Sequence, residues 1–109
     1  MRKLMLISVG LLLTGAVSLR AADAKDTYDA QHCAMCHGAD GKGKTRMGGK
    51  LGVKDWTDAK VQEGLKDADM IKVIKEGAKQ DDETKMKAYS DLSDDEVKAL
   101  VAYIRAFKK

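Results

Sequence analysis

Cys33-Ala34-Met35-Cys36-His37 is the stretch that decides this fold, because it gathers both cysteines and one of the two histidines into five positions. On a helix, residues i, i+3 and i+4 share a face, so the two thiols and the imidazole would point the same way. This spacing suits covalent haem attachment, in which each thiol adds to one vinyl group and the histidine binds the iron. The sequence therefore predicts one haem c, bound covalently through Cys33 and Cys36, with His37 as a metal ligand.

A closely spaced cysteine pair has two other common uses. Redox-active disulfides occur in folds that alternate strands and helices, and this chain shows no strand-like alternation. A zinc site needs four ligands, which one cysteine pair without a histidine pair does not supply. Haem attachment is therefore the preferred interpretation, and the disulfide and zinc readings are the minor ones.

The first 24 residues have the three parts of a secretory signal. A positive start, Met1 to Lys3, precedes an apolar run from Leu4 to Leu19, and small residues follow at Ala22 and Ala24. The apolar run has 16 residues, fewer than the roughly 20 that span a membrane. We expect residues 1–24 to be a cleaved signal peptide and residues 25–109 the mature domain, with cleavage after Ala21 as the alternative. Export also agrees with haem attachment, which in bacteria takes place outside the cytoplasm, so the periplasm is the expected location.

Charge says little about partners. The whole chain has a formal net charge of +3, but residues 25–109 hold 17 basic and 16 acidic side chains and carry only +1. Neither this balance nor any motif favours nucleic-acid binding. A domain of this size has a small core of its own, and a haem enclosed by the chain would supply much of the apolar interior.

The segment Gly38 to Thr45 matches the phosphate-loop pattern G-x-x-x-x-G-K-[ST]. A phosphate loop needs a buried strand before it and a helix after it. Here the haem motif precedes the loop, so nucleotide binding is not predicted. We interpret the glycines as a loop that passes close to the haem edge.

Local signals predict helices and no strands. A short first helix is expected over residues 26–36, ending at Gly38. Asp67 is expected to cap a second helix that runs through Glu76 and stops at Gly77. Residues 78–85 are polar and are predicted to be a loop. Ser93 to Glu96 forms a capping box before the apolar positions of a long C-terminal helix, namely Val97, Leu100, Val101, Ile104 and Phe107.

Three segments resemble the small class I cytochromes c. They are CAMCHGADGKG at residues 33–43, KDWTD at 54–58 and MKAYSDLSDDEVKALVAYIRAF at 86–107. The resemblance covers residues 28–109 and implies an all-α fold, a small cytochrome c fold with three to four helices wrapped around one haem. Two features depart from the family pattern. Tyr28 lies five residues before the first haem cysteine instead of four, and the chain has no proline, so we expect a carbonyl near residues 51–53 to accept the bond from the haem histidine.

The second axial ligand is expected from a methionine far along the chain. Met86 lies just before the last helix, where the family places its ligand, although Lys87 replaces the usual proline after it. The other candidates are placed less well for this role, and these are His32, Met35, Met47 and Met70.

The resemblance implies a periplasmic electron carrier, with one-electron transfer through a His/Met-ligated haem and no enzymatic activity. The alternative is a haem-based ligand binder or weak peroxidase, if Met86 dissociates. The expected partners are redox proteins, such as membrane-bound respiratory complexes or a terminal oxidase. No nucleic acid or nucleotide is expected to bind, and the chain is expected to be a monomer.

Two further expectations concern the haem edge. Trp56 and Arg46 are candidates to bind the haem propionates, and each has an ordinary structural role as its alternative. Lysines could also ring the exposed edge and attract acidic partners, and these are Lys42, Lys44, Lys50, Lys54, Lys85 and Lys87.

Overall fold

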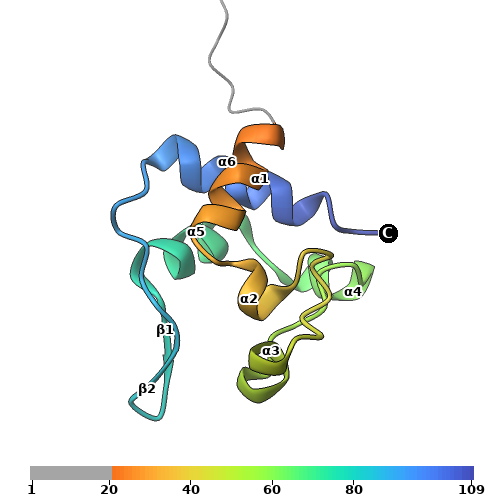
Figure 1. Ribbon diagram of the computed structural model, residues 1–109, viewed down its shortest axis with the longest axis vertical. Helices are drawn as coiled ribbons and strands as arrows, with labels where there is room; N and C mark the ends of the chain where they lie inside the picture. Colours follow the sequence, from red (N-terminus) through yellow and green to blue (C-terminus); the bar gives the residue numbers. More distant parts are fainter. Residues whose placement is uncertain (1–20) are drawn as a thin grey trace, which may run out of the picture.

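The computed structural model describes residues 21–109, and the expected signal segment lies outside this part except for its last four residues (Figure 1). None of the helices in residues 21–109 has the length and apolar character needed to cross a membrane. The described chain forms six helices and one small sheet, in the order α1 (Ala21–Ala30), α2 (Ala34–His37), α3 (Arg46–Leu51), α4 (Ala59–Gly64), α5 (Asp67–Glu76), β1 (Ala78–Gln80), β2 (Glu83–Met86) and α6 (Asp94–Arg105).

The core lies where α6 meets α1 and α5 (Figure 1). Helix α6 buries one apolar stripe at helical spacing, and Tyr28 of α1 packs against it with 1% of its surface exposed. This interior is small, as expected for a short chain. Its buried members are Tyr28, Met70, Ile74, Leu92, Val97, Leu100, Val101 and Ile104.

The C-terminal helix has the predicted start. Ser93 Oγ accepts a hydrogen bond from the Glu96 backbone N–H, and the Glu96 carboxylate accepts one from the Ser93 N–H, which completes the capping box. The helix ends at Arg105, two residues before Phe107, whose ring still packs beside Tyr103 at a centroid distance of 5.0 Å. The prediction of a long last helix is confirmed.

Helix α5 has the predicted extent but not the predicted cap. Lys66 occupies the N-cap position and provides no side-chain cap, while Asp67 is the first helical residue. The carboxylate of Asp67 accepts hydrogen bonds from Arg105 instead, so its expected capping role was wrong. Gly77 ends the helix with a φ of 81°, as expected for a glycine stop.

The expected first helix is two helices. Helix α1 ends at Ala30, and α2 begins at Ala34 after a turn in which His32 has a φ of +61°. This turn takes up the extra residue between Tyr28 and Cys33. Tyr28 therefore still reaches the last helix, with its ring 5.1 Å from that of Tyr103. Its hydroxyl donates to the Gly38 carbonyl at 2.6 Å.

Residues 78–86 form an antiparallel hairpin, which corrects the prediction of a loop over 78–85 and of a chain without strands. Strand β1 pairs with β2 in a register that joins Gln80 to Glu83, with an irregularity after Ala78. Asp81 and Asp82 both have positive φ, at 52° and 64°, which is the conformation of a tight type I′ turn. The hairpin projects from the helices at the lower left of Figure 1, and the fold is otherwise helical.

The glycine-rich loop after His37 packs against other residues of the chain. It follows helix α2, so the strand that a phosphate loop requires is not there. A Cβ on Gly41, whose φ is +72°, would lie 2.6 Å from the Phe107 ring, and one on Gly48 would meet the Cys36 carbonyl. Gly41 therefore packs closely against the Phe107 ring, and the expectation that this loop passes close to the haem edge stays a prediction.

Candidate cofactor site

One cavity of about 610 Å³ lies between α2, α5, α6 and the hairpin. This size is within the usual range of cofactor and ligand sites, about 300 to 1,000 Å³. Cys33, Cys36 and His37 line it from α2 and its cap, and Met86 lines it from β2. The four predicted site residues, separated by up to 53 positions in the chain, therefore meet at one cavity.

The remaining wall is mostly apolar, and part of it comes from core residues. Helices α5 and α6 contribute side chains that are also part of the buried cluster. Such a wall suits a flat apolar group and excludes water from it. These residues are Met70 and Ile74 of α5 and Leu100 and Ile104 of α6, and Leu92, which lies just before α6, is a further buried residue of the wall.

The haem motif is helical, as its spacing predicted. Cys33 occupies the N-cap of α2 with helical dihedral angles, and the His37 backbone N–H donates to the Cys33 carbonyl at 2.9 Å. One turn of helix therefore presents both thiols and the imidazole to the same cavity. The Thr45 hydroxyl stabilises this turn, because it donates a hydrogen bond to the Cys36 carbonyl at 2.7 Å.

The chemistry of the thiols argues against a redox-active disulfide. Both cysteines are free and partly buried. Burial raises the pKa of the Cys33 thiol to about 11, whereas redox-active cysteine pairs have a lowered thiol pKa. Cys33 is thus not activated as a nucleophile for disulfide exchange.

His37 is suited to bind a metal as a neutral imidazole. Burial lowers its pKa to about 4, so the ring holds no extra proton at neutral pH. The ring stacks on Trp56 with a centroid distance of 4.0 Å and an interplanar angle of 14°. Its Nδ1 is a buried atom without a hydrogen-bond partner among the described residues. The expected bond from this nitrogen to a carbonyl near residues 51–53 is therefore not made.

Two methionines reach the interior of the cavity. Met86 is partly buried on β2, and Met70 of α5 has 8% of its surface exposed. Met35 lines the cavity with 63% of its surface exposed, while Met47 is exposed and does not line it. His32 is an exposed lining residue in the turn before the motif. Position therefore leaves Met86 and Met70 as the candidates for a sulfur ligand.

The structure places the two residues expected to bind the haem propionates differently. Trp56 lines the cavity and lies between His37 and Phe107, whose ring centroid is 6.1 Å away. Arg46 is exposed on α3 and is not part of the lining. For Arg46 the structure therefore favours the alternative role, that of a charged side chain in solvent.

Sequence reasoning missed Gln62. This residue belongs to the short helix α4, and only 5% of its surface is exposed. Its side-chain amide donates to the Trp56 carbonyl at 2.7 Å, so it contacts the residue that stacks on His37. Nothing in the local sequence distinguishes it from a surface glutamine.

The helical fold and a cavity framed by a Cys-x-x-Cys-His turn define a small c-type cytochrome. The family model described as "Cytochrome C oxidase, cbb3-type, subunit III" matches residues 19–104, and the chain belongs to this family. A solved structure described as "KustC0563 c-type cytochrome" is similar over 79% of this chain and 98% of that chain, with 36% sequence identity and a TM-score of 0.64. The comparison with curated proteins gave no match.

Proposed function

We propose that this protein is a one-electron carrier whose haem c is joined to Cys33 and Cys36 and ligated by His37 and Met86. Haem-based electron transfer is what a c-type cytochrome implies. The observation that carries the finer proposal is the single cavity lined by both thiols, a neutral imidazole and Met86. The haem would supply the redox chemistry, and the chain would hold it, exclude water and set its ligands.

The ligand set favours electron transfer over turnover of a substrate. If His37 and Met86 both held a haem iron, no position would be open for peroxide or a gas. A thioether opposite an imidazole also favours ferrous iron and raises the reduction potential relative to two nitrogen ligands. The ligand binder and the weak peroxidase require Met86 to leave the iron.

The proposed location is the periplasm, after removal of a signal peptide. The position of cleavage affects the fold, because Ala24 of α1 is buried with 2% of its surface exposed. Cleavage after Ala24 would remove this packed side chain, whereas cleavage after Ala21 would keep it. The matching family is named after a cytochrome c oxidase, and we propose a redox protein such as a terminal oxidase as the partner of a monomeric chain.

Spectroscopy of the holoprotein tests the function. Denaturing electrophoresis should show haem staining on the polypeptide, and the ferric protein should show the near-infrared band of a sulfur-to-iron bond. Carbon monoxide should bind the ferrous protein poorly, because Met86 holds the sixth position. Rapid carbon monoxide binding without the near-infrared band would instead support the ligand binder.

A further inference from the structure

Most metal-binding histidines have their ring plane fixed by a hydrogen bond from the second ring nitrogen. His37 makes no such bond, since its Nδ1 is buried without a partner among the described residues. Its close neighbour is the parallel Trp56 ring, 4.0 Å away. The orientation of the imidazole therefore depends on how firmly Trp56 is held.

Trp56 is held through both of its backbone polar groups. Its N–H donates to the Gly41 carbonyl at 2.8 Å, and its carbonyl accepts from Gln62 Nε2 at 2.7 Å. The indole also lies nearly parallel to the Phe107 ring, at an angle of 20°. Gln62 is therefore the side chain that anchors the tryptophan from outside its own loop.

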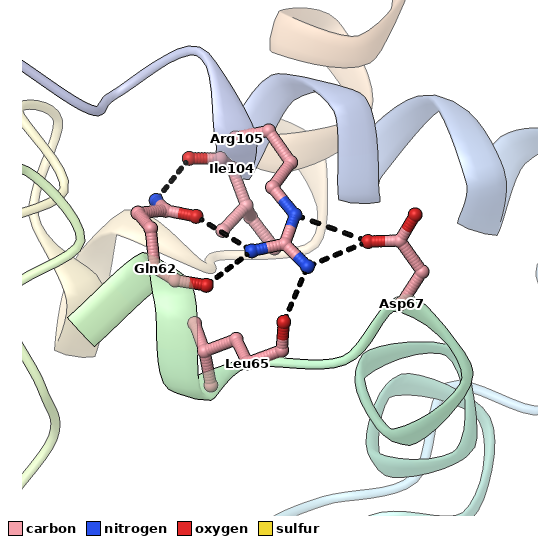
Figure 2. A network of polar contacts seen from close by, with 5 residues as sticks. All are labelled: Gln62, Leu65, Asp67, Ile104 and Arg105. Carbon is pink, nitrogen blue, oxygen red and sulfur yellow. Dashed lines mark hydrogen bonds and ion pairs between the residues drawn. The ribbon is translucent and has the colours of Figure 1, made fainter. Parts of the chain in front are cut away.

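Gln62 is itself fixed by a network on the side of α6 (Figure 2). Its Nε2 also donates to the Ile104 carbonyl at 2.9 Å, and its Oε1 accepts from Arg105 Nη1 at 3.0 Å. A reversed amide would place its NH₂ against the guanidinium donors and its oxygen against two carbonyls, so these partners allow one orientation only. Arg105 in turn binds the Gln62 and Leu65 carbonyls and the Asp67 carboxylate.

We propose that Gln62 is a positioning residue for the axial histidine, acting through the Trp56 carbonyl and the Trp56–His37 stack. This inference rests on the proposed function, because it assigns the imidazole to the haem iron. The stack fixes the orientation of the His37 ring that a bound haem would meet. Gln62 fixes the stack through the Trp56 carbonyl and is not itself part of the cavity lining.

The test uses the covalent holoprotein and two substitutions of Gln62. Gln62→Met keeps the length and apolar volume of the side chain but removes its donors. Gln62→Glu keeps an acceptor for Arg105 and loses the N–H groups that bind the two carbonyls. Asp67→Asn is the matched control, because it weakens the exposed end of the same network and leaves the bonds of Gln62 in place.

The readouts are the proton NMR shifts of the haem methyl groups in the ferric protein and the reduction potential. Methyl shifts follow the orientation of the axial imidazole plane, which a purely structural role would leave alone. Both Gln62 variants should keep the covalent haem but change the pattern of methyl shifts and the potential. Asp67→Asn should keep the wild-type pattern.

Wild-type shifts in either Gln62 variant overturn the inference, even if its melting temperature falls. If neither variant folds, nuclear Overhauser contacts between the Trp56 indole and the His37 ring in the ferrous wild type decide the question. Their presence, with the Gln62 side-chain amide protons protected from exchange, supports the inference, and the absence of either overturns it. A wild-type protein without covalent haem contradicts the proposed function instead.

Discussion

The two candidate axial ligands, His37 and Met86, come from regions that differ in burial and in hydrogen bonding. We call residues 28–56 together with α6 the histidine side, and residues 77–89 the methionine side. On the histidine side, Tyr28 is buried and bonds the Gly38 carbonyl, while Thr45 bonds the Cys36 carbonyl. The methionine side is a short hairpin with mostly exposed residues.

The methionine side is hydrogen-bonded to the helices at its two ends, and at its start the Gly77 N–H donates to the Val73 carbonyl at 2.7 Å. The Tyr89 backbone N–H donates to the Ile74 carbonyl at 2.8 Å, and the Tyr89 hydroxyl donates to the Gln31 carbonyl at 3.2 Å. Segments with few buried contacts open at lower free-energy cost than core helices do. We therefore expect the protein to lose the methionine ligand before the histidine ligand as denaturant is added.

The largest expected effect comes from removing the attachment on the histidine side. Cys33→Ala combined with Cys36→Ala should abolish haem staining of the denatured polypeptide, because no thiol is left to bond the porphyrin. The haem-free chain should also fold poorly, since the wall of the cavity loses the group it packs against. Far-ultraviolet circular dichroism measures this loss. Staining that survives the double substitution would contradict covalent attachment through these residues.

The second effect separates the two methionines of the cavity. Met86→Ala should remove the near-infrared sulfur-to-iron band, lower the reduction potential and allow carbon monoxide to bind. Met70→Ala should keep the band and lower the free energy of unfolding by about 2 to 5 kcal/mol, because Met70 is buried in the core. Denaturant titration of both holoproteins, with absorbance spectra, provides the measurement. If Met70→Ala lost the band and Met86→Ala kept it, the ligand would be Met70.

Only part of this fold could be predicted from the amino-acid sequence. The haem motif and the last helix are local patterns, and the spacing of Cys33 to His37 and the Ser93 capping box predict them directly. The hairpin was missed because its strands have only three and four residues and carry no apolar alternation. Its Asp81-Asp82 turn also lacks the glycine that usually marks a type I′ turn.

The role of Gln62 was missed for a different reason. Its bond to the Ile104 carbonyl joins residues 42 positions apart, so no local pattern contains it. The stack between His37 and Trp56 likewise depends on how the loop between them closes. Sequence therefore predicted candidate ligands that line one cavity, but not the contacts that hold them.

The third largest effect is expected from a substitution that partly destabilises the methionine side. At Gly77, where φ is +81°, an added Cβ would lie 2.7 Å from the Met86 carbonyl oxygen. Gly77→Ala should therefore displace the backbone of the candidate ligand and add strain of about 1 to 3 kcal/mol, because φ of 81° with ψ of −179° is a conformation that essentially only glycine adopts. The near-infrared band should weaken and disappear at a lower denaturant concentration than in wild type. Gly49→Ala is the control, because a Cβ there meets nothing within 4 Å, and equal stability of the band in both variants would count against this account.

The smallest effect concerns charge near the mouth of the cavity. Of the six lysines expected around the haem edge, the structure places Lys54, Lys85 and Lys87 in the lining. Lys85 pairs with Glu83 at 3.0 Å, and the Lys87 amine lies 5.2 Å from the centre of the Tyr89 ring. The methionine side therefore carries two of the three basic groups that an approaching redox partner would meet.

These lysines should attract anionic oxidants to the methionine side. Oxidation of the ferrous holoprotein by the hexacyanoferrate(III) anion should be slower in the Lys85→Gln, Lys87→Gln variant at low salt. The difference should shrink near 0.1 M salt, where the Debye length is about 10 Å. Lys60→Gln with Lys98→Gln makes the same change in net charge away from the cavity, and it should have a smaller effect. Equal slowing in both double variants would mean that total charge, and not the lysines at the cavity, governs the encounter, while a neutral quinone oxidant should react at similar rates with all three proteins.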